Sequence, residues 1–512
     1  MMDLDFDNRF LRELPGEPSE DARSREVRGA MWSPVSPTPV SAPWLLAHSP
    51  ALAAAIGFGA NDVMTPAFAR VFGGNELIEG MQPFATRYGG HQFGHWAGQL
   101  GDGRAISLGE VRGADGRRHE LQLKGAGRTP YSRHADGRAV LRSSLREFVC
   151  SEAMHALGVP TTRALSLVAT GDEVVRDMFY DGRPESEPGA IVCRVAPSFI
   201  RFGHYEILAA SDETELLDRL IDFTLARDFP HIEGTRAERR ARWFREICER
   251  SAELAAHWMR IGFVHGVLNT DNMSVLGLTI DYGPYGFVEE FDPAFTPNTT
   301  DANGRRYAYG RQPAVVHWNL ARLGSALLGQ IDEQALQDGL DHYAIHHQTC
   351  ARAMTAAKFG LGTLRDDDFA LIGDAHALLA ASSIDHSLFF RTLASHAQAD
   401  DFAVHAYDLP KFIDARPALQ AWLDRYAQRV AGTDDAARRQ CMDTVNPLYL
   451  PRNWLCQEAI DAARQGDLAP LRRLIEATAD PYRERAGFEH QAGKRPEWAR
   501  DRAGCAMLSC SS

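Results

Sequence analysis

The sequence lacks several features that would assign it to other classes of protein. No apolar run approaches the roughly 18 residues that a membrane-spanning helix requires. Lysine and arginine (55 residues) are fewer than aspartate and glutamate (68 residues), the net charge is −13, and no basic run occurs. Because nucleic acids and anionic membranes attract basic surfaces, we expect neither of them as a partner.

Signals for secretion and for a cysteine scaffold are also missing. The N-terminal stretch MMDLDFDNRFLRELPGE is charged and has no apolar core of the kind found in signal peptides, so we expect a cytoplasmic protein. The first six of the eight cysteines are scattered without C-x-x-C spacing, which argues against a zinc finger or a disulfide scaffold. No internal repeat is present.

What the sequence does contain is enough chain for a large core. Its 512 residues, 45% of them hydrophobic and 24% charged, have the composition of a globular protein with several domains. Residues 1–45 are expected to form an extended arm, because the stretch from Trp32 to Pro43 is rich in proline and serine. Residues 44–80 show short helical patterns.

The stretch from Ile261 to Gly286 holds the most informative polar residues. An apolar run leads to Asp271 and Asn272, and a short apolar strand then ends in Asp281, the first residue of an Asp-Tyr-Gly triplet. Carboxylate and amide oxygens are hard ligands that suit Mg²⁺, and the phosphates of a nucleotide can complete its coordination shell. The stretch therefore indicates a magnesium–phosphate site, with a solvated surface turn as the alternative.

A glycine-rich region from Tyr88 to Gly127 contains two predicted strands. Turn residues separate an apolar run from an alternating run that ends at Lys124, which is typical of a β-hairpin. Glycines let the backbone approach phosphates closely, and the lysine could reach the same phosphates; a tight turn with an exposed lysine is the alternative. His91 and His95 are four residues apart, but zinc is not expected because no partner carboxylate is near.

A helical pattern follows, from Gly137 to Leu157. Its apolar residues recur at steps of three and four, and a glycine and a proline end it. Glu147 and Glu152 lie on this helix, and either of them could hold Lys124 in a buried ion pair. Solvated glutamates are the alternative.

Strands and then helices complete the chain. Residues 161–196 read as three strands, and the last leads into Arg194 and Arg201, whose guanidinium groups suit phosphate oxygens or surface salt bridges. After residue 203 the patterns are mostly helical, with one long helix from Arg236 to Ile261. We expect the helices after residue 330 to pack on this helical part.

The order of these features matches the layout of protein kinases. A glycine loop, a strand lysine, a helix glutamate, a central strand, a His…Asn loop and an Asp-x-Gly triplet follow one another. His265 precedes Asn272 by seven residues, as in the kinase catalytic loop. The position of the kinase catalytic aspartate, however, is Val267, which cannot accept a proton. The layout therefore predicts either an inactive kinase or a kinase-like enzyme with different chemistry.

Longer motifs resemble those of the selenoprotein O family, a pseudokinase-like group. The matching stretches are YGGHQFGHWAGQLGDGRA, ELQLKGAGRTPYSRHADGRAVLRSSLREF, RVAPSFIRFGHYE, HGVLNTDNMS, IDYGPYGF and the tail SCSS. They cover nearly the whole chain in the order of that family, which makes a chance match implausible.

The resemblance implies a fold and an activity. The fold would be α+β and protein-kinase-like, with two lobes: residues 1–80 an N-terminal arm with short helices, 81–203 a mixed β/α N-lobe, 204–330 a helical C-lobe, and 331–512 a helical extension with a cysteine-containing tail. The activity would be that of a protein adenylyltransferase, which transfers AMP from ATP to Ser, Thr or Tyr hydroxyls of proteins (AMPylation). ATP would bind in a flipped orientation, with its α-phosphate facing the acceptor.

The same resemblance implies roles for individual residues. Asp271 would be the proton acceptor, in place of the aspartate lost at Val267. Asn272 and Asp281 would bind Mg²⁺, with Mn²⁺ as the alternative ion, and Glu147 would hold Lys124 in an ion pair. The residues that would contact ATP are Gly101, Gly103, Arg104, Lys124, Asp136, Gly137, Arg194, Arg201 and Asp281.

Three alternatives to AMP transfer stay open, together with one hypothesis about the tail. UMP transfer with Mn²⁺ could use the same residues, ordinary protein phosphorylation is disfavoured by Val267, and a catalytically silent pseudokinase could bind nucleotide and act as a scaffold. Many members of the family have selenocysteine third from the end, where this chain has Cys510; its nearest partner is Cys505. Redox regulation by these two cysteines is a hypothesis motivated by their place in a tail that we expect to be mobile, although their spacing is not C-x-x-C.

Overall fold

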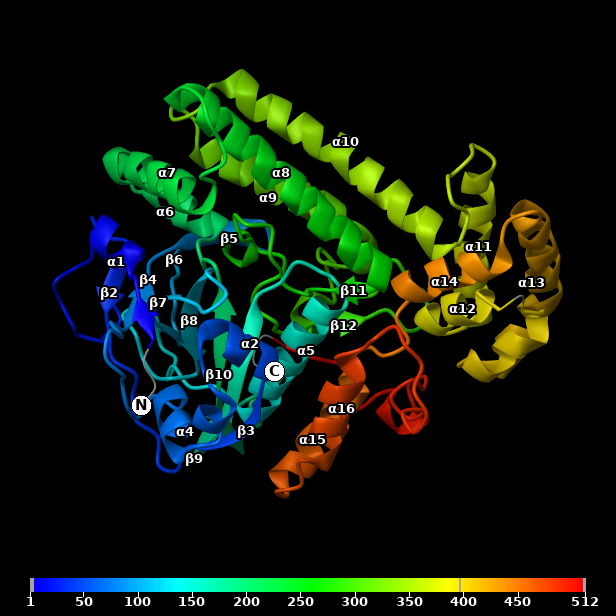
Figure 1. Ribbon diagram of the computed structural model, residues 1–512, viewed down its shortest axis with the longest axis horizontal. Coiled ribbons are helices and arrows are strands. Elements are labelled where there is room, and N and C mark those ends of the chain that lie inside the picture. Colours follow the sequence, from blue (N-terminus) through cyan, green and yellow to red (C-terminus); the bar gives the residue numbers. More distant parts are fainter. Residues whose placement is uncertain (1–3, 396, 510–512) are drawn as a thin grey trace.

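The computed structural model describes residues 4–395 and 397–509 and has an α+β architecture (Figure 1). The N-terminal part, mostly blue to cyan in Figure 1, contains most of the strands, and the regular elements from residue 202 onward are helices apart from β11 and β12. The predicted α+β class is thereby confirmed. None of the helices in these two described ranges has both the length and the apolar character that crossing a membrane would take.

An antiparallel sheet of eight strands is the framework of the N-terminal part. Its order is β2-β4-β7-β8-β10-β9-β3, and β1 pairs with β7 beside this path. The strands are β1 (Asp5–Phe6), β2 (Trp32–Pro34), β3 (Trp44–His48), β4 (Phe84–Thr86), β7 (Ala105–Arg112), β8 (Arg118–Lys124), β9 (Arg163–Arg176) and β10 (Glu185–Ala196). Two small sheets pair β5 (Gly89–Gln92) with β6 (His95–Gln99), and β11 (Phe263–Val264) with β12 (Gly286–Phe287).

The alternation of side chains along β8 and β10 separates the core from the cavity described below. Leu121 and Leu123 of β8 are buried in the apolar cluster on one face of the sheet. Gln122 and Lys124 therefore point to the other face, because successive strand side chains alternate. Arg194 of β10 is paired directly with Gln122 and shares its face. Two neighbouring strands thus place three polar side chains on one side of the sheet.

Helices cover both faces of this sheet. Short helices near the N-terminus pack on one face, and α5 packs against β9 and β10 on the other. Two helices from the end of the chain, α15 and α16, pack in turn on α5 (Figure 1). The bounds are α2 (Pro50–Ile56), α3 (Ala60–Val63), α4 (Pro66–Phe72), α5 (Leu141–Ala156), α15 (Asn453–Arg464) and α16 (Ala469–Thr478). The expectation that the late helices pack on the helical part is therefore wrong for α15 and α16, which return to the sheet.

The helical part is built on two long helices, α8 and α10, which lie side by side (Figure 1). Helix α8 spans Arg236–Ile261, as predicted from the sequence. It begins with a capping box between Thr235 and Glu238 and ends at Gly262, whose φ of 73° stops the helix. Because α8 runs directly into β11, its end positions the loop that carries Asp271. The other helices here are α6 (Phe202–Ala210), α7 (Thr214–Asp228), α9 (Gln312–Ala326) and α10 (Glu333–Lys358).

A separate group of helices, α11 to α14, has its own apolar core at one end of the molecule (Figure 1). These helices are α11 (Asp368–Ser382), α12 (His386–Leu393), α13 (Leu409–Val430) and α14 (Asp435–Val445). Helix α1 (Arg9–Glu13) lies near the other end. The 3₁₀ segments are η1 (Thr270–Asn272), η2 (Thr299–Asp301), η3 (Tyr309–Arg311), η4 (Ala399–His405) and η5 (Glu497–Ala499).

Candidate active site

A cavity of about 720 Å³ is lined by residues of the sheet and of the loops that follow α8. It brings together all residues that were expected to bind ATP, to bind the metal ion or to accept the proton. They are Gly101, Gly103, Arg104, Lys124, Asp136, Gly137, Arg194, Arg201, Asp271, Asn272 and Asp281. These residues span a stretch of 181 positions, so only the fold makes them neighbours.

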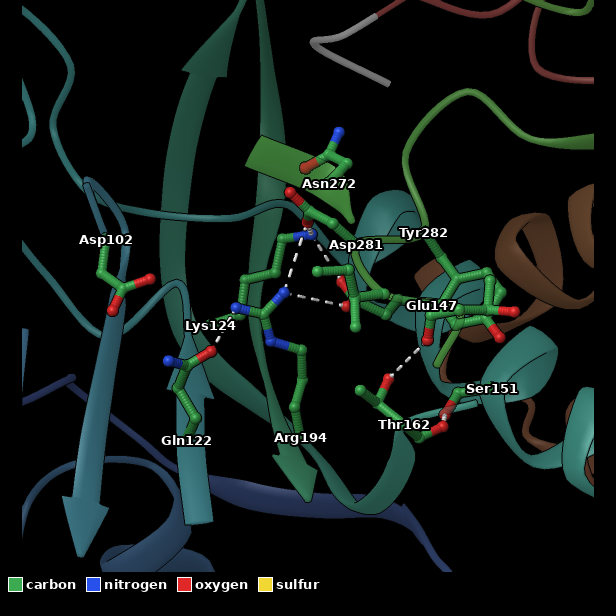
Figure 2. Close-up of polar contacts among 12 residues, drawn as sticks. Asp102, Gln122, Lys124, Glu147, Ser151, Thr162, Arg194, Asn272, Asp281 and Tyr282 are labelled. Atoms are coloured by element: carbon green, nitrogen blue, oxygen red, sulfur yellow. Dashed lines mark hydrogen bonds and ion pairs between the residues drawn. The ribbon is translucent and has the colours of Figure 1, made fainter. Parts of the chain in front are cut away.

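Lys124, the last residue of β8, is held by two carboxylates. Its Nζ atom lies 2.7 Å from Glu147 Oε2 and 2.6 Å from Asp281 Oδ1. Arg194 of β10 approaches the same two carboxylates, at 3.4 Å from Glu147 and 3.3 Å from Asp281. Figure 2 shows these four side chains converging from β8, β10, α5 and the Asp-Tyr-Gly segment. The lysine side chain is only 6% exposed, and these carboxylates supply the counter-charge that a buried ammonium group needs.

The register of the sheet explains why the two cations are neighbours. Antiparallel pairing places Val192 opposite Lys124 and Arg194 opposite Gln122. The side-chain carbonyl of Gln122 accepts a hydrogen bond from Arg194, which fixes the guanidinium over the neighbouring strand (Figure 2). A shift of one residue would send the arginine to the apolar face.

One face of α5 delivers Glu147. Ser144 and Ser151 lie about one turn before and after it, and their hydroxyls donate to backbone carbonyls of β10 and of the segment before β9 at 3.0 and 2.6 Å. These bonds dock the helix so that Glu147 faces the lysine. Glu152, the other glutamate considered from the sequence, instead pairs with Arg163 at 2.7 Å.

Asp281 combines a special backbone conformation with a strongly positive environment. Its φ of 63° lies in the left-handed region, which aspartate tolerates better than most residues. Burial would raise the pKa of its carboxyl group, but the surrounding cations hold that pKa well below its ordinary value. These cations are Lys124, Arg194, Arg201 and Arg104. Asp281 is therefore a permanent anion at neutral pH, suited to binding a cation and unsuited to accepting a proton.

Arg201 is a buried cation that ties the acidic segments together. It is 2% exposed, and its Nη1 atom donates to the carbonyl of Asp271 at 2.9 Å and to Asn272 Oδ1 at 3.5 Å. The same nitrogen lies 3.8 Å from Asp281 Oδ2. The guanidinium also lies over the ring of Tyr88, at 4.9 Å. One side chain thus links the segments that carry Asp271 and Asp281.

Asp271 lies in η1 and has one satisfied and one unsatisfied carboxylate oxygen. Gln92 Nε2 donates to Oδ2 at 3.3 Å, whereas Oδ1 is buried and has no hydrogen-bond partner in the described ranges of the chain. Burial raises the pKa of Asp271 to about 7, against the lowering effect of Arg201. A cavity-lining carboxylate with a pKa near neutrality has the properties of a general base.

His265 and Val267 occupy the positions at which kinases carry histidine and the catalytic aspartate. His265 is 1% exposed and donates from Nε2 to the carbonyl of Ile280 at 2.9 Å, so it ties the loop to the residue before Asp281. Burial lowers its pKa, which keeps the ring neutral. Val267 lines the cavity, and its carbonyl accepts a hydrogen bond from Asn272 Nδ2 at 2.9 Å. This bond turns the Asn272 oxygen toward Asp281 (Figure 2).

Glycine is required in two turns at the cavity wall. Gly101 has a φ of 101°, and a Cβ atom there would lie 2.5 Å from the ring of Tyr131. Gly137 has a φ of 73°, and a Cβ atom there would lie 2.0 Å from the carbonyl of Gly127. A Cβ atom at Gly103 would lie 2.8 Å from the Tyr131 carbonyl. These close approaches leave bare backbone facing the cavity, as phosphate binding requires.

Two residues that the sequence reasoning missed complete the walls of the cavity. Arg176, the last residue of β9, binds both carboxylate oxygens of Asp136 at 2.6 and 2.8 Å. Gln92 orients Asp271, as described above. Gln92 lies inside the glycine-rich block, and its position between glycines was a signal that could have marked it as a site residue. Nothing in the sequence around Arg176 distinguished that arginine from a surface residue.

A divalent ion fits the oxygen donors at the cavity. Arg201 Nη1 lies 3.8 Å from Asp281 Oδ2 and 3.5 Å from Asn272 Oδ1. Because these contacts are long, both oxygens can still bind an ion. No group of three or more His, Cys, Asp or Glu side chains within the described ranges could hold a metal ion by itself. Mg²⁺ is usually bound by one or two protein oxygens, with water and substrate phosphates completing the shell. Asn272 and Asp281 are adequate for that mode of binding.

The remaining cysteine and histidine predictions concern residues away from the cavity. Cys505 is 8% exposed, and burial raises the pKa of its thiol to about 12, which keeps it protonated at neutral pH. Cys510 lies outside the described residues. His91 and His95 lie on a β-hairpin rather than a helix, and His91 pairs with Glu206 at 2.6 Å.

Comparison with known proteins adds to this geometry. A sequence model of the family described as "Protein adenylyltransferase SelO" matches residues 21–479. Proteins named "Protein nucleotidyltransferase YdiU" from Azoarcus sp. (strain BH72) and from Xanthomonas campestris pv. campestris (strain B100) are 58% and 59% identical to the chain. Both comparisons cover 100% of this chain and 100% of the relative. The chain therefore belongs to the SelO family of protein nucleotidyltransferases.

Proposed function

We propose that this nucleotidyltransferase transfers AMP from ATP to serine, threonine or tyrosine hydroxyls of other proteins. The observation that carries the proposal is Asp271, a cavity-lining acid whose buried Oδ1 has no hydrogen-bond partner among the described residues, in a cavity that Lys124, Arg194 and Arg201 also line. The position of the usual kinase base is a valine in the same cavity, so Asp271 is the best-placed proton acceptor.

Asp271 removes the proton from the acceptor hydroxyl. The hydroxyl oxygen forms a bond to the α-phosphorus while the bond between that phosphorus and the bridging oxygen of the β-phosphate breaks, and pyrophosphate leaves. The proton goes to the Asp271 carboxylate. A pKa of about 7 suits this role, because the carboxylate is substantially ionised at neutral pH and still basic enough to accept a proton. Gln92 holds the second oxygen and so fixes the direction of the base.

Lys124, Arg194 and Arg201 neutralise the leaving group. Each of the three is at most 5% exposed, and buried cations interact strongly with phosphate charge. Guanidinium groups match phosphate oxygens in pairs, and pyrophosphate carries more charge than one phosphoryl group. A flipped ATP would set its β- and γ-phosphates against these cations and leave its α-phosphate toward Asp271. The presence of three buried cations in one cavity supports a site for the outer phosphates.

Asn272 and Asp281 would hold Mg²⁺, or Mn²⁺ in its place. When bound, the ion polarises the phosphate and offsets the charge that develops during transfer. The low pKa of Asp281 keeps that ligand ionised without competition from protons.

We also propose a kinase-like division of the chain into two lobes. Residues 81–203 would form the N-lobe and residues 204–330 the C-lobe. Residues 1–80 would be an arm that adds β1, β2 and β3 to the N-lobe sheet, and residues 331–512 an extension whose last helices pack on α5. The ion pair between a strand lysine and a helix glutamate, at 2.7 Å, supports this division, as does a cavity lined from both sides.

Two labelled forms of ATP test the proposed function. The purified protein is incubated with Mg²⁺ and ATP labelled on either the α- or the γ-phosphate, and the label retained on denatured protein is measured. Label from the α-position alone is expected. Label from the γ-position alone would show a kinase, and ATP binding without label would favour a scaffold. A parallel reaction with α-labelled UTP and Mn²⁺ decides between AMP and UMP.

A further inference from the structure

Two arginines beside the hairpin β5–β6 have no carboxylate within ion-pair distance in the described part of the chain. The guanidinium groups of Arg306 and Arg322 lie 4.5 Å and 5.4 Å from the ring centre of Trp318. The Nε atom of each arginine is buried without a hydrogen-bond partner, and within residues 4–395 and 397–509 neither guanidinium pairs with a carboxylate. Most partly buried arginines elsewhere in the chain do have such a partner, as Arg163 and Arg495 show. We name Arg306, Trp318 and Arg322 the arginine–tryptophan surface.

Two acidic residues close to this surface, Asp301 and Glu206, already have other partners. Asp301 accepts the backbone N–H groups of Arg306 and Tyr307, at 2.9 and 2.8 Å. Glu206, which is 4% exposed, pairs with His91 at 2.6 Å. Asp301 therefore offsets part of the charge of Arg306 without forming an ion pair with it, and both guanidinium groups keep donors for a molecule from outside.

The hairpin β5–β6 connects the surface to Asp271. On one side, Gln92 donates to the Asp271 carboxylate at 3.3 Å. On the other, a Cβ atom at Gly94 would lie 3.3 Å from Arg306 Nη1. Gln92 and Gly94 are two residues apart, so their Cα atoms are within about 7 Å of each other. The arginine–tryptophan surface therefore lies beside the place where an acceptor hydroxyl must approach.

We propose that Arg306, Trp318 and Arg322 bind an acidic segment of the acceptor protein. This inference rests on the proposed function and names the class of acceptor. Guanidinium groups bind carboxylates with paired hydrogen bonds, and the indole ring holds both groups in place. The whole chain carries a net charge of −13, so an acidic segment is repelled by most of the protein and attracted to this surface.

The geometry also limits where the acidic residues of the acceptor stand. The path from the Asp271 carboxylate through Gln92 and Gly94 to Arg306 is on the order of 15 Å, and an extended peptide spans about 3.3 Å per residue. The acidic residues therefore lie within about five positions of the modified hydroxyl. ATP is not the ligand of this surface, because none of its three residues lines the cavity.

Three peptides test the proposal. Each has a central serine, flanked by glutamates in the first, glutamines in the second and lysines in the third. Their binding to the full-length protein is followed by fluorescence anisotropy, and AMP transfer is followed with α-labelled ATP. The glutamate peptide is expected to bind best. Loss of one charged contact corresponds to about a tenfold weakening, so Arg306→Gln and Arg322→Gln should each raise Kd and KM for this peptide by about that factor, with KM for ATP unchanged.

Charge reversal and a remote arginine complete the experiment. The double variant Arg306→Glu/Arg322→Glu should prefer the lysine peptide, whereas Arg439→Gln, an exposed arginine of α14, should change nothing. Equal binding of the three peptides by the unmodified protein, or an equal loss for all three in the variants, would overturn the proposal. If no peptide receives AMP, the proposed function fails, while anisotropy still decides the preference for acidic segments.

Discussion

At the scale of single residues, Asp271 and Asp281 show how one side-chain type acquires two chemistries. Both carboxylates line the same cavity, yet the pKa of Asp271 is raised to about 7 and that of Asp281 is held well below its ordinary value. Both are desolvated, and the difference comes from the cations, which surround Asp281 more closely. The sequence placed both acids in one site, but it could not show which of them the lysine and arginines would contact.

Replacing Asp271 with asparagine should remove the base and leave the binding site intact. We expect AMP transfer to fall by about 10²–10⁴-fold, the range lost with a general base, while the affinity for ATP changes little. Transfer from α-labelled ATP and calorimetric ATP binding measure the two effects. Asp281→Asn is the comparison, because it should abolish metal-dependent ATP binding as well. An unchanged rate in Asp271→Asn would remove this residue from the mechanism.

Gln92→Leu should lower turnover without weakening ATP binding. The variant removes the hydrogen bond that orients Asp271, and we expect kcat to fall by about tenfold, the value of one hydrogen bond to a charged group. Gln99→Leu on β6 of the same hairpin is the matched control, because Gln99 contacts the N-terminal arm through the carbonyl of Arg25 at 2.8 Å. If both variants lost kcat equally, the hairpin rather than the hydrogen bond would be responsible.

Glu120→Gln should stabilise the protein at alkaline pH. Burial, followed by repulsion from Glu110, raises the pKa of Glu120 from 4.5 to about 7. The folded state therefore holds this proton more tightly than the unfolded state, and stability falls as the pH rises from about 4.5 to 7. A pKa shift of this size lowers the free energy of unfolding by about 3 kcal/mol above pH 7.

Urea unfolding of Glu120→Gln at pH 5 and pH 8 measures this effect. The gain in stability over the unmodified protein should be larger at pH 8. Glu110→Gln is the control of opposite sign, since Glu110 pairs with the buried Arg227 at 2.8 Å and its loss should destabilise the fold. If the gain in stability of Glu120→Gln were the same at pH 5 and pH 8, the raised pKa of Glu120 would be contradicted.

At the scale of elements, the spacing of apolar residues predicted uninterrupted helices well but did not predict irregularities within strands. Helix α8 has the predicted bounds, because an uninterrupted amphipathic pattern and two caps define it. The predicted strands between residues 161 and 179 are instead one strand, β9 (Arg163–Arg176). Gly171, with a φ of 76°, lies within this strand, and the pairing with β10 shifts its register nearby. Local sequence does not distinguish a bulge from a turn.

The hairpin β5–β6 should tolerate no side chain at Gly90. A Cβ atom there would lie 2.8 Å from Asp271 Oδ1 and 2.9 Å from Asp271 Cβ, so alanine must displace either the hairpin or the base. We expect Gly90→Ala to lose AMP transfer by at least about tenfold, because small displacements of catalytic groups are costly. Gly373→Ala in α11 is the control, since no atom lies within 4 Å of its added Cβ. Normal transfer by Gly90→Ala would show that the hairpin is not rigidly placed.

At the scale of the whole molecule, distant segments meet in ways that local patterns do not reveal. Helices α15 and α16 pack on α5, about 300 residues earlier in the chain, although their sequence shows only that each has one apolar face. The residues of the candidate site were predictable because motifs preserve their order and spacing, whereas the partner of an apolar helix face depends on the assembled fold. The end of the chain therefore supports the helix that carries Glu147.

A buried ion pair joins this last part of the chain to the group α11–α14. Arg452, just before α15, donates from Nη1 and Nη2 to the two carboxylate oxygens of Asp385, both at 2.8 Å. The two side chains are 3% and 0% exposed, and Arg452 also lies 3.4 Å from Glu289, which follows β12. Three parts of the molecule thus depend on one arginine.

Removing this arginine should destabilise the whole protein. Arg452→Met leaves Asp385 as a buried, unpaired anion, for which we expect a loss of about 3–5 kcal/mol in the free energy of unfolding, measured with urea. Adding Asp385→Asn removes the unpaired charge and should recover part of that loss. The control is Arg425→Met, whose partner Asp374 lies at 2.6 Å in a pair that is about half exposed and should contribute less than about 1 kcal/mol. If Arg452→Met cost no more than Arg425→Met, the contact between α15 and the α11–α14 group would have to rest on apolar packing alone.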